Sequence, residues 1–302
     1  MEDIRSRVLR GIALNRTPGF HFSGNFLAIE LAEVGERTRV VMEAGPHATG
    51  ADEQVHIGPV LMVADIALAA SIRARLSPAT RLATVSMHVQ MNGRPMRGTI
   101  EARSQFCGFA EGAASTLGLS RVAILAGGEE AGFGHGTFMA LDPPPGVTMH
   151  PVQTTRVREV DLPAEESLDE SERGILKRAE AALAGGDGSF ISRFLGISPR
   201  KTDGGASCRM ENGAHVGNRV GHAQGGILMG LAAATAGAAL GAQWPLASIA
   251  ASFTSPGEGD VLEASAAVVH RGRWTAVVRV EVTAPQGRRV LEATTTHARR
   301  TE

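Results

Sequence analysis

Two features of the sequence contain residue types that could carry chemistry. The first is Asp65, a carboxylate inside the otherwise apolar run of residues 60–68. Removing a carboxylate from water is costly, so Asp65 needs a hydrogen-bonding partner or a chemical task. The second is the polar, glycine-rich turn of residues 218–226, which leads into an apolar stretch. A helix that starts there presents free backbone N–H groups at its positive end. The alternative interpretations are a structural aspartate and a turn that only permits tight entry into the helix.

The stretches that position these residues occur twice in the chain. Residues 56–65 have the same design as residues 218–231, with different polar groups. A constant offset of 168 positions relates six identical pairs: Phe26 and Phe194, Leu27 and Leu195, Met42 and Met210, Gly45 and Gly213, His47 and His215, and Gly58 and Gly226. We interpret this as an internal duplication, because 302 residues suffice for two domains of ordinary size. The first unit is predicted at residues 1–142 and the second at residues 161–302. The proline-rich segment that starts after Asp142 begins a linker at residues 143–160.

Each unit is predicted to hold one long buried helix and an antiparallel set of strands. The first of these helices spans residues 58–76, and the second has no Asp, Glu, Lys or Arg between Arg219 and Glu258. A helix without a polar face must be covered by a curved sheet, so the fold class is α+β. The remaining predicted elements of the first unit are a helix at 2–13 and strands at 26–33, 38–43, 83–91, 99–106, 113–125 and 132–141. A solvated helix at 165–184 opens the second unit, and residues 189–299 repeat the order of strand, loop, helix and strands.

Composition excludes several classes of protein. A net charge of −1 argues against a general nucleic-acid binder. The uncharged run after Gln224 is rich in Ala and Gly and contains Pro245, so a buried helix is favoured over a membrane span. The charged N-terminus is no signal peptide, and we expect a cytoplasmic protein. Cys107 and Cys208 are expected to be reduced and buried. Neither the cysteines nor the histidines have the spacing of a metal site, so no metal or cofactor is predicted.

The spacing of the polar residues resembles a known family. Asn218, Gly221, Gln224, Gly225 and Gly226 match the pattern Asn-x-x-Gly-x-x-(His or Gln)-Gly-Gly of hotdog acyl-CoA thioesterases of the phenylacetic-acid-degradation type. In that family an acid follows seven residues after the second glycine. The resemblance covers nearly all of both units except the linker. It implies a double hotdog, in which each of two tandem repeats wraps a curved antiparallel sheet around its long helix.

The resemblance also implies roles for individual residues. The helix start at Gly225 and Gly226 would polarise a thioester carbonyl, and Gln224 and Asn218 would orient the thioester. The family's acid is a general base or nucleophile, and Asp65 occupies its position seven residues after Gly58. Thr84 stands where the family often has a hydroxyl that orients water, although a hydroxyl at a strand edge explains it equally well.

The two units differ in a complementary way. The first unit keeps Asp65, but Pro59 removes one N–H from the start of its helix. The second unit keeps the polar motif and has Ala233 where the acid would stand. One complete site is therefore expected, with the acid from one unit and the helix start from the other, while the mirror site around His56 is expected to be inactive.

Three functions fit these features. The resemblance favours an acyl-CoA thioesterase that acts without a cofactor, as a monomer or a homodimer of such chains. A hotdog hydratase or dehydratase would pair the acid with a catalytic histidine, but the complete site has Gln224 instead. A non-catalytic acyl-CoA-binding or sensor protein would have no use for Asp65. The acyl chain, and the choice between coenzyme A and another thiol carrier, stay open.

Overall fold

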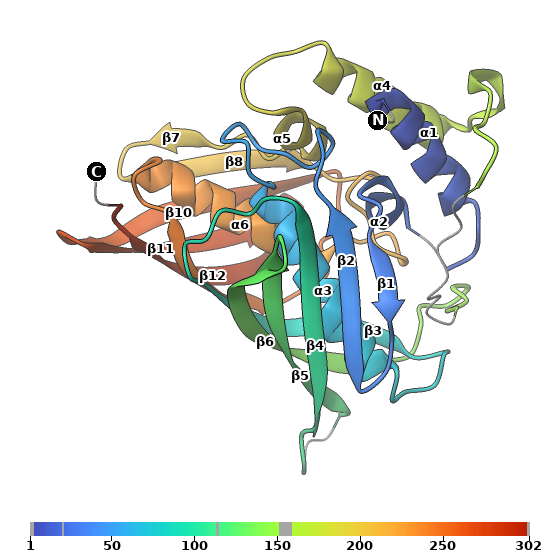
Figure 1. Cartoon of the computed structure of the whole chain (residues 1–302), viewed down its shortest axis with the longest axis horizontal. Coiled ribbons are helices and arrows are strands. Elements are labelled where there is room, and N and C mark those ends of the chain that lie inside the picture. The colour runs from blue at the N-terminus through green and yellow to red at the C-terminus, as the bar shows by residue number, and fades with distance from the viewer. Residues whose placement is uncertain (1–2, 20, 113–114, 151–158, 301–302) are drawn as a thin grey trace.

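The computed structural model describes residues 3–19, 21–112, 115–150 and 159–300, and it forms one antiparallel sheet of twelve strands (Figure 1). The strands are β1 Glu30–Glu33, β2 Arg37–Glu43, β3 Arg81–Met91, β4 Thr99–Phe109, β5 Leu117–Ala126, β6 Glu129–Leu141, β7 Arg200–Thr202, β8 Gly205–Glu211, β9 Leu246–Phe253, β10 Val261–Arg271, β11 Thr275–Thr283 and β12 Arg289–Ala298. Residues 113–114 of the predicted strand 113–125 and residues 151–158 of the predicted linker lie outside the described residues.

The order of the strands has a two-fold pattern. It runs β1-β2-β4-β5-β6-β3-β9-β12-β11-β10-β8-β7, so each strand of the first half has its counterpart six strands later at the mirrored place. The halves join through β3 and β9, which pair antiparallel with Met87 opposite Ala251. Continuous pairing across this seam makes one curved sheet from both halves of the chain.

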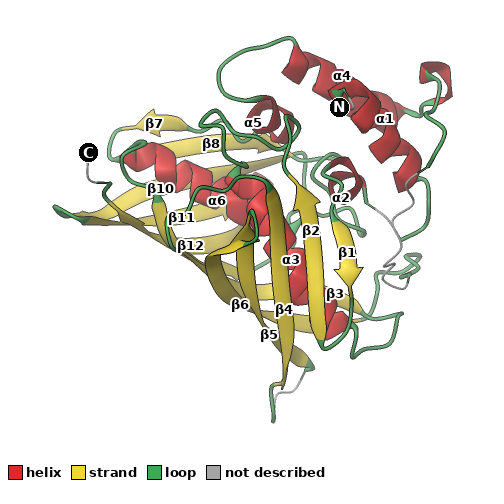
Figure 2. Ribbon diagram, viewed as in Figure 1, coloured by secondary structure: helices red, strands yellow, loops and turns green. Residues whose placement is uncertain are grey.

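Two long helices lie side by side within the curve of this sheet (Figure 2). Helix α3 spans Ile57–Arg73 and packs against β2, β4 and β5, whereas α6 spans Gly225–Leu240 and packs against β8, β10 and β11. Glycines permit their close contact: a Cβ on Gly226 would lie 2.4 Å from the Cα of Met62, and one on Gly230 would lie 2.5 Å from the Cα of Gly58. Because the later residue of α6 meets the earlier residue of α3, the helices run antiparallel.

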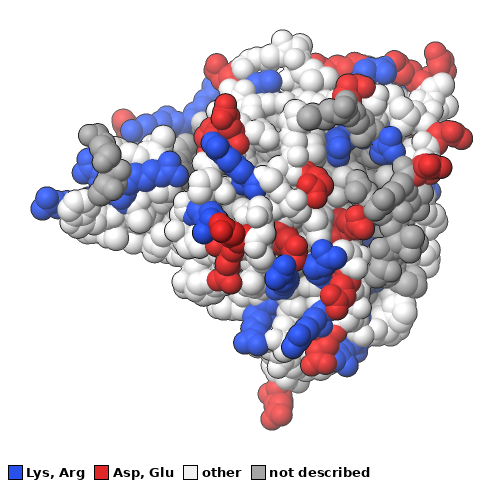
Figure 3. Space-filling view, viewed as in Figure 1, with Lys and Arg blue, Asp and Glu red and all other residues white. Residues whose placement is uncertain are grey.

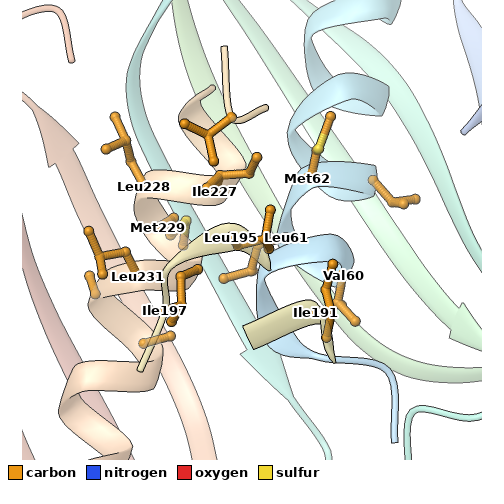
Figure 4. Close-up of a cluster of buried hydrophobic side chains, with 14 of the residues drawn as sticks. Val60, Leu61, Met62, Ile191, Leu195, Ile197, Ile227, Leu228, Met229 and Leu231 are labelled. Atoms are coloured by element: carbon orange, nitrogen blue, oxygen red, sulfur yellow. The ribbon is translucent and has the colours of Figure 1, made fainter. Parts of the chain in front are cut away.

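The apolar side chains of both helices form the central core. Figure 4 shows Val60, Leu61 and Met62 of α3 in one cluster with Ile227, Met229 and Leu231 of α6, and all six are fully buried. Ile191, Leu195 and Ile197 complete the cluster at the start of α3. The sequence of α6 is apolar on all sides because the sheet, α3 and this cluster surround it.

Two shorter helices replace predicted strands. Residues 26–29 were predicted to begin a strand, but α2 spans Phe22–Phe26 and β1 begins only at Glu30. Helix α5, at Phe190–Leu195, likewise stands where the segment 189–299 was predicted to begin with a strand. Phe22 and Phe26 are four residues apart, so both rings lie on one face of a helix, where Phe26 packs 4.9 Å from Phe194 between ring centroids. This aromatic packing between the two halves outweighs the strand preference of the sequence.

Two further helices cover one end of the sheet. Helix α1 spans Ile4–Asn15, and α4 spans Glu170–Leu183 behind a capping box of Asp169 and Glu172. Arg16 pairs with Glu172 at 2.7 Å and so ties the two helices together. Among the described residues, no helix combines the length and the apolarity needed to cross a bilayer.

The outer face of the sheet carries charges of both signs. Figure 3 shows Lys and Arg mixed with Asp and Glu over β2, β4 and β5, where Arg39 lies 3.9 Å from Glu101. The cysteine prediction was right for Cys208, which is buried, and wrong for Cys107, which is exposed. Cys107 is exposed because it continues the outward-facing series of Glu101, Arg103 and Gln105 along β4.

The close contact of α3 and α6 leads to a stability prediction. Gly230→Ala places a methyl group against the backbone of Gly58, so we expect the free energy of unfolding to fall by about 1–3 kcal/mol. Gly237→Ala is the matched control on the same helix, because a Cβ there meets no atom within 4 Å. It should leave stability unchanged or raise it by up to about 1 kcal/mol. Urea unfolding of both variants measures the difference, and equal effects would argue against tight helix contact.

Candidate active site

Asp65 lies in the middle of α3 and is 5% exposed. Since α3 and α6 are antiparallel, its side chain meets the start of α6 and not the start of its own helix. The Nε2 of Gln224 donates to Asp65 Oδ2 at 2.7 Å. Asp65 and Gln224 are thus in direct contact, although they lie 159 residues apart in the sequence.

Thr84 binds the other oxygen of the same carboxylate. Thr84 is the fourth residue of β3, and its hydroxyl donates to Asp65 Oδ1 at 3.1 Å. The pairing of β3 with β6 shifts register between Thr84 and Ser86, and such a bulge re-aims the side chains beside it. Both carboxylate oxygens therefore have a donor, one from each half of the chain.

Gln224 is also the N-cap residue of α6. Its Oε1 accepts from the backbone N–H of Ile227 at 2.9 Å, which leaves Nε2 for Asp65 and fixes the orientation of the amide. The equivalent residue of the first half, His56, caps α3 through Nδ1, which accepts from Gly58 N–H at 3.1 Å. The first half thus keeps the cap, but Ala233 offers no carboxylate there.

Gly225, the first residue of α6, leaves space around the carboxylate. A Cβ on Gly225 would lie 3.1 Å from Asp65 Oδ2 and 3.1 Å from Thr84 Oγ1, so any side chain there would crowd the site. Among the described residues, the N–H of Gly225 has no acceptor. A ligand oxygen that reached this N–H would lie beside the carboxylate at the positive end of the helix.

The surroundings of Asp65 change its acidity. Burial raises the pKa of Asp65 from 3.8 to about 6, and hydrogen bonds from Thr84, the backbone of Gly226 and Gln224 oppose this increase. At neutral pH the group is a buried carboxylate with a pKa close to the working pH, which suits a general base. A strongly perturbed carboxyl in a cavity is typical of a functional site.

Asn218 organises the loop before α6. Its Oδ1 accepts from the N–H groups of Val220 at 3.0 Å and His222 at 3.1 Å, and its own N–H donates to the carbonyl of His222 at 2.7 Å. The side chain therefore shapes the turn that leads to Gln224. Asn218 itself lies on the wall of the same cavity as Asp65.

A cavity of about 910 Å³ opens beside these residues. Its wall includes Asp65, Thr84, Gln224 and Gly225 and continues along α1, α2 and the C-terminal part of α3. This volume is in the upper range for small-molecule sites. No sequence pattern indicated a role for several charged residues of this wall, among them Arg73, Arg81 and Arg219. His222 was within the polar turn, and it bridges Arg81 at 3.3 Å and Glu258 at 2.9 Å.

Comparison with known proteins gives one sequence match. Residues 216–298 match the family model described as acyl-CoA thioesterase N-terminal domain, a segment that contains Gln224, α6 and β9 to β12. This match shows that part of the second half of the chain is similar to an acyl-CoA thioesterase domain. No curated protein sequence matches the chain.

Solved structures of thioesterases share the fold of this chain at low sequence identity. The tesB protein of Mycobacterium avium subsp. paratuberculosis aligns with a TM-score of 0.55 at 16% identity, over 90% of this chain and 96% of that one. The 12:0-ACP thioesterase of Umbellularia californica aligns with a TM-score of 0.54 at 12% identity, over 87% of this chain and 94% of that one. Both likenesses concern the architecture alone.

The acidity of Asp65 leads to a pH prediction. A general base works when deprotonated, so kcat/KM should rise with pH, reach half its maximum near pH 6 and then level off. Thr84→Val removes a hydrogen bond that favours the carboxylate form, so its midpoint should lie at higher pH. Initial rates between pH 4.5 and about pH 8.5 test both statements. A flat wild-type profile over that range would remove Asp65 as the titrating base.

Proposed function

We propose that the chain hydrolyses an acyl-CoA thioester at one composite site, with the acid from the first half and the carbonyl-binding helix start from the second. The observation that carries this proposal is the 2.7 Å contact between buried Asp65 and Gln224, at the start of α6 and on the wall of the large cavity. We also propose that the architecture is a double hotdog, with units at residues 1–142 and 161–302 and a linker at 143–160. The mirrored strand order and the antiparallel central helices support this division.

The chemistry begins with a water molecule beside Asp65. The carboxylate takes a proton from the water as the oxygen attacks the thioester carbon, and the carbonyl oxygen gains negative charge. The N–H of Gly225, at the start of a helix of 16 residues, is placed to donate to that oxygen. The carbon–sulfur bond then breaks, and protonated Asp65 returns its proton to the leaving thiolate. The products are a carboxylic acid and a free thiol, and no other reactant is required.

The neighbouring residues act by positioning. Gln224 holds Asp65 in place and caps α6, so it sets the distance between base and carbonyl site. Thr84 is within hydrogen-bonding distance of the carboxylate and can also orient the attacking water. Asn218 contributes through the turn before Gln224, since its Oδ1 already binds two backbone N–H groups.

Release of free thiol from a panel of acyl-CoA thioesters tests the proposal. The wild-type protein should release thiol from at least one member at a rate well above the spontaneous one. A hydratase would instead change an enoyl-CoA without releasing thiol, and a binding protein would bind the thioesters without converting them. Either outcome, with correctly folded protein, would contradict the proposed hydrolysis.

A further inference from the structure

Two arginines lie on the cavity wall at a distance from Asp65. Arg73 is the last residue of α3, eight residues beyond Asp65, which corresponds to about 12 Å along the helix axis. Arg219 belongs to the turn before α6, which reaches the same wall from the other half of the chain. The pair is thus remote from the reacting carbonyl but within the same cavity.

A shared acceptor brings the two guanidinium groups together. Arg73 Nη2 donates to the carbonyl oxygen of His150 at 3.3 Å, and Arg219 Nη1 donates to the same oxygen at 3.1 Å. Burial, and after it the charge of Arg73, lowers the pKa of Arg219 to about 10. Two like charges are therefore held side by side in a partly dehydrated place, an arrangement that is unfavourable without an anion.

The part of the chain that the structure describes does not supply that anion. Among the described residues, neither Arg73 nor Arg219 forms an ion pair with a carboxylate. The Nε of Arg73 is buried and has no hydrogen-bond partner there. The Nε2 of His21, also on the cavity wall, is likewise buried and unpartnered. Two buried nitrogen atoms of cavity-wall residues, Nε of Arg73 and Nε2 of His21, thus have no hydrogen-bond partner among the described residues.

We infer that Arg73 and Arg219 bind an oxyanion of the substrate, either a carboxylate at the far end of the acyl group or a phosphate of the carrier thiol. This inference rests on the proposed thioesterase site, because it assumes that the scissile carbonyl lies at Gly225. Paired guanidiniums suit the recognition of carboxylate and phosphate alike, because both groups offer several acceptor oxygens. The neutral ring of His21 can add one further hydrogen bond. The pair would then select substrates by their remote charge and not by the reacting bond.

Binding of non-hydrolysable thioether analogues tests this inference without requiring turnover. Four analogues combine two carriers, coenzyme A and uncharged N-acetylcysteamine, with two chains of equal length, one ending in a methyl group and one in a carboxylate. Calorimetry on wild type, Arg73→Gln and Arg219→Gln gives the dissociation constants. Arg75→Gln is the matched control, since Arg75 lies two residues beyond Arg73, pairs with Glu36 at 2.8 Å and is not part of the cavity wall.

We expect each cavity variant to weaken binding of the analogues that carry the recognised anion by roughly tenfold or more. Analogues without that anion should bind the variants and the wild type equally. A loss confined to carboxylate-ended chains identifies the acyl group as the source, and a loss confined to coenzyme A analogues identifies the phosphate. Equal dissociation constants across all proteins, or no binding by the wild type, would overturn the inference. A wild type that binds an anionic analogue but releases no thiol from any thioester would contradict the proposed hydrolysis alone.

Discussion

Replacing Asp65 by asparagine should lower kcat by two orders of magnitude or more and leave the affinity for substrate largely intact. The amide keeps the shape of the carboxylate and can still hydrogen-bond to Gln224 and Thr84, but it cannot accept a proton from water. General-base catalysis contributes about 10²–10⁴-fold to a rate, so its loss should appear in kcat. Steady-state kinetics give kcat, and calorimetry with a thioether analogue gives the affinity. A variant with near-normal turnover would remove Asp65 from the chemistry.

The same substitution has a second expected effect, on stability. The folded pKa of Asp65 is raised from 3.8 to about 6, so the folded protein binds this proton more tightly than the unfolded chain does. Ionisation of Asp65 therefore destabilises the fold progressively as pH rises from about 4 to about 6, by about 3 kcal/mol in total. Asp65→Asn lacks this cost and should be more stable than the wild type at pH 8. A variant that loses both activity and stability at pH 8 would indicate a structural aspartate.

Gln224→Ala should lower kcat/KM roughly ten- to hundredfold. It removes the hydrogen bond to a buried carboxylate, and such bonds contribute about 1.5–3 kcal/mol. It also raises the pKa of Asp65 further, because the Gln224 hydrogen bond favours the ionised form. The pH midpoint of kcat/KM should therefore move upward, a change that simple loss of stability would not produce.

His56→Ala is the matched control for Gln224→Ala. Both residues cap a central helix, and either substitution removes a cap that typically contributes about 1 kcal/mol to stability. The His56 position has Ala233 where an acid would stand and Pro59 within the first turn of α3. Turnover by His56→Ala should therefore remain close to that of the wild type. Equal losses in the two variants would show that both helix starts are needed.

Part of this arrangement could be predicted from the sequence, because similar motifs occur in both halves and can be compared position by position. The apolar run after Gln224 predicted a buried helix, and α6 is that helix. The spacing from Gly58 to Asp65 placed the acid too far from its own helix start, so a partner from the other unit was expected. In the structure, that partner is Gln224, which donates a hydrogen bond to Asp65. The short helices α2 and α5 were missed, because their formation depends on packing between phenylalanines of the two halves.

The pairing of Arg73 with Arg219 on the cavity wall could not be predicted either, because it also depends on contacts between the two halves. By sequence alone, the arginines of the inter-strand turns (Arg94, Arg97, Arg271 and Arg273) are candidates to meet a phosphate, although a solvated face explains them better. None of these four belongs to the cavity wall. Arg73 and Arg219 are 146 positions apart, and only the fold brings both to the carbonyl of His150. A local sequence pattern cannot predict a contact between residues so far apart in the chain.

If each chain has one composite site, it should bind one equivalent of substrate, and the binding stoichiometry can be measured directly. Calorimetric titration of Asp65→Asn with a thioether analogue of an accepted acyl-CoA avoids turnover and counts sites. We expect one tight site per chain, retained in the Asp65→Asn/His56→Ala double variant and weakened in Asp65→Asn/Gln224→Ala. Two equivalent sites per chain, or a site lost with His56 and kept without Gln224, would contradict this expectation.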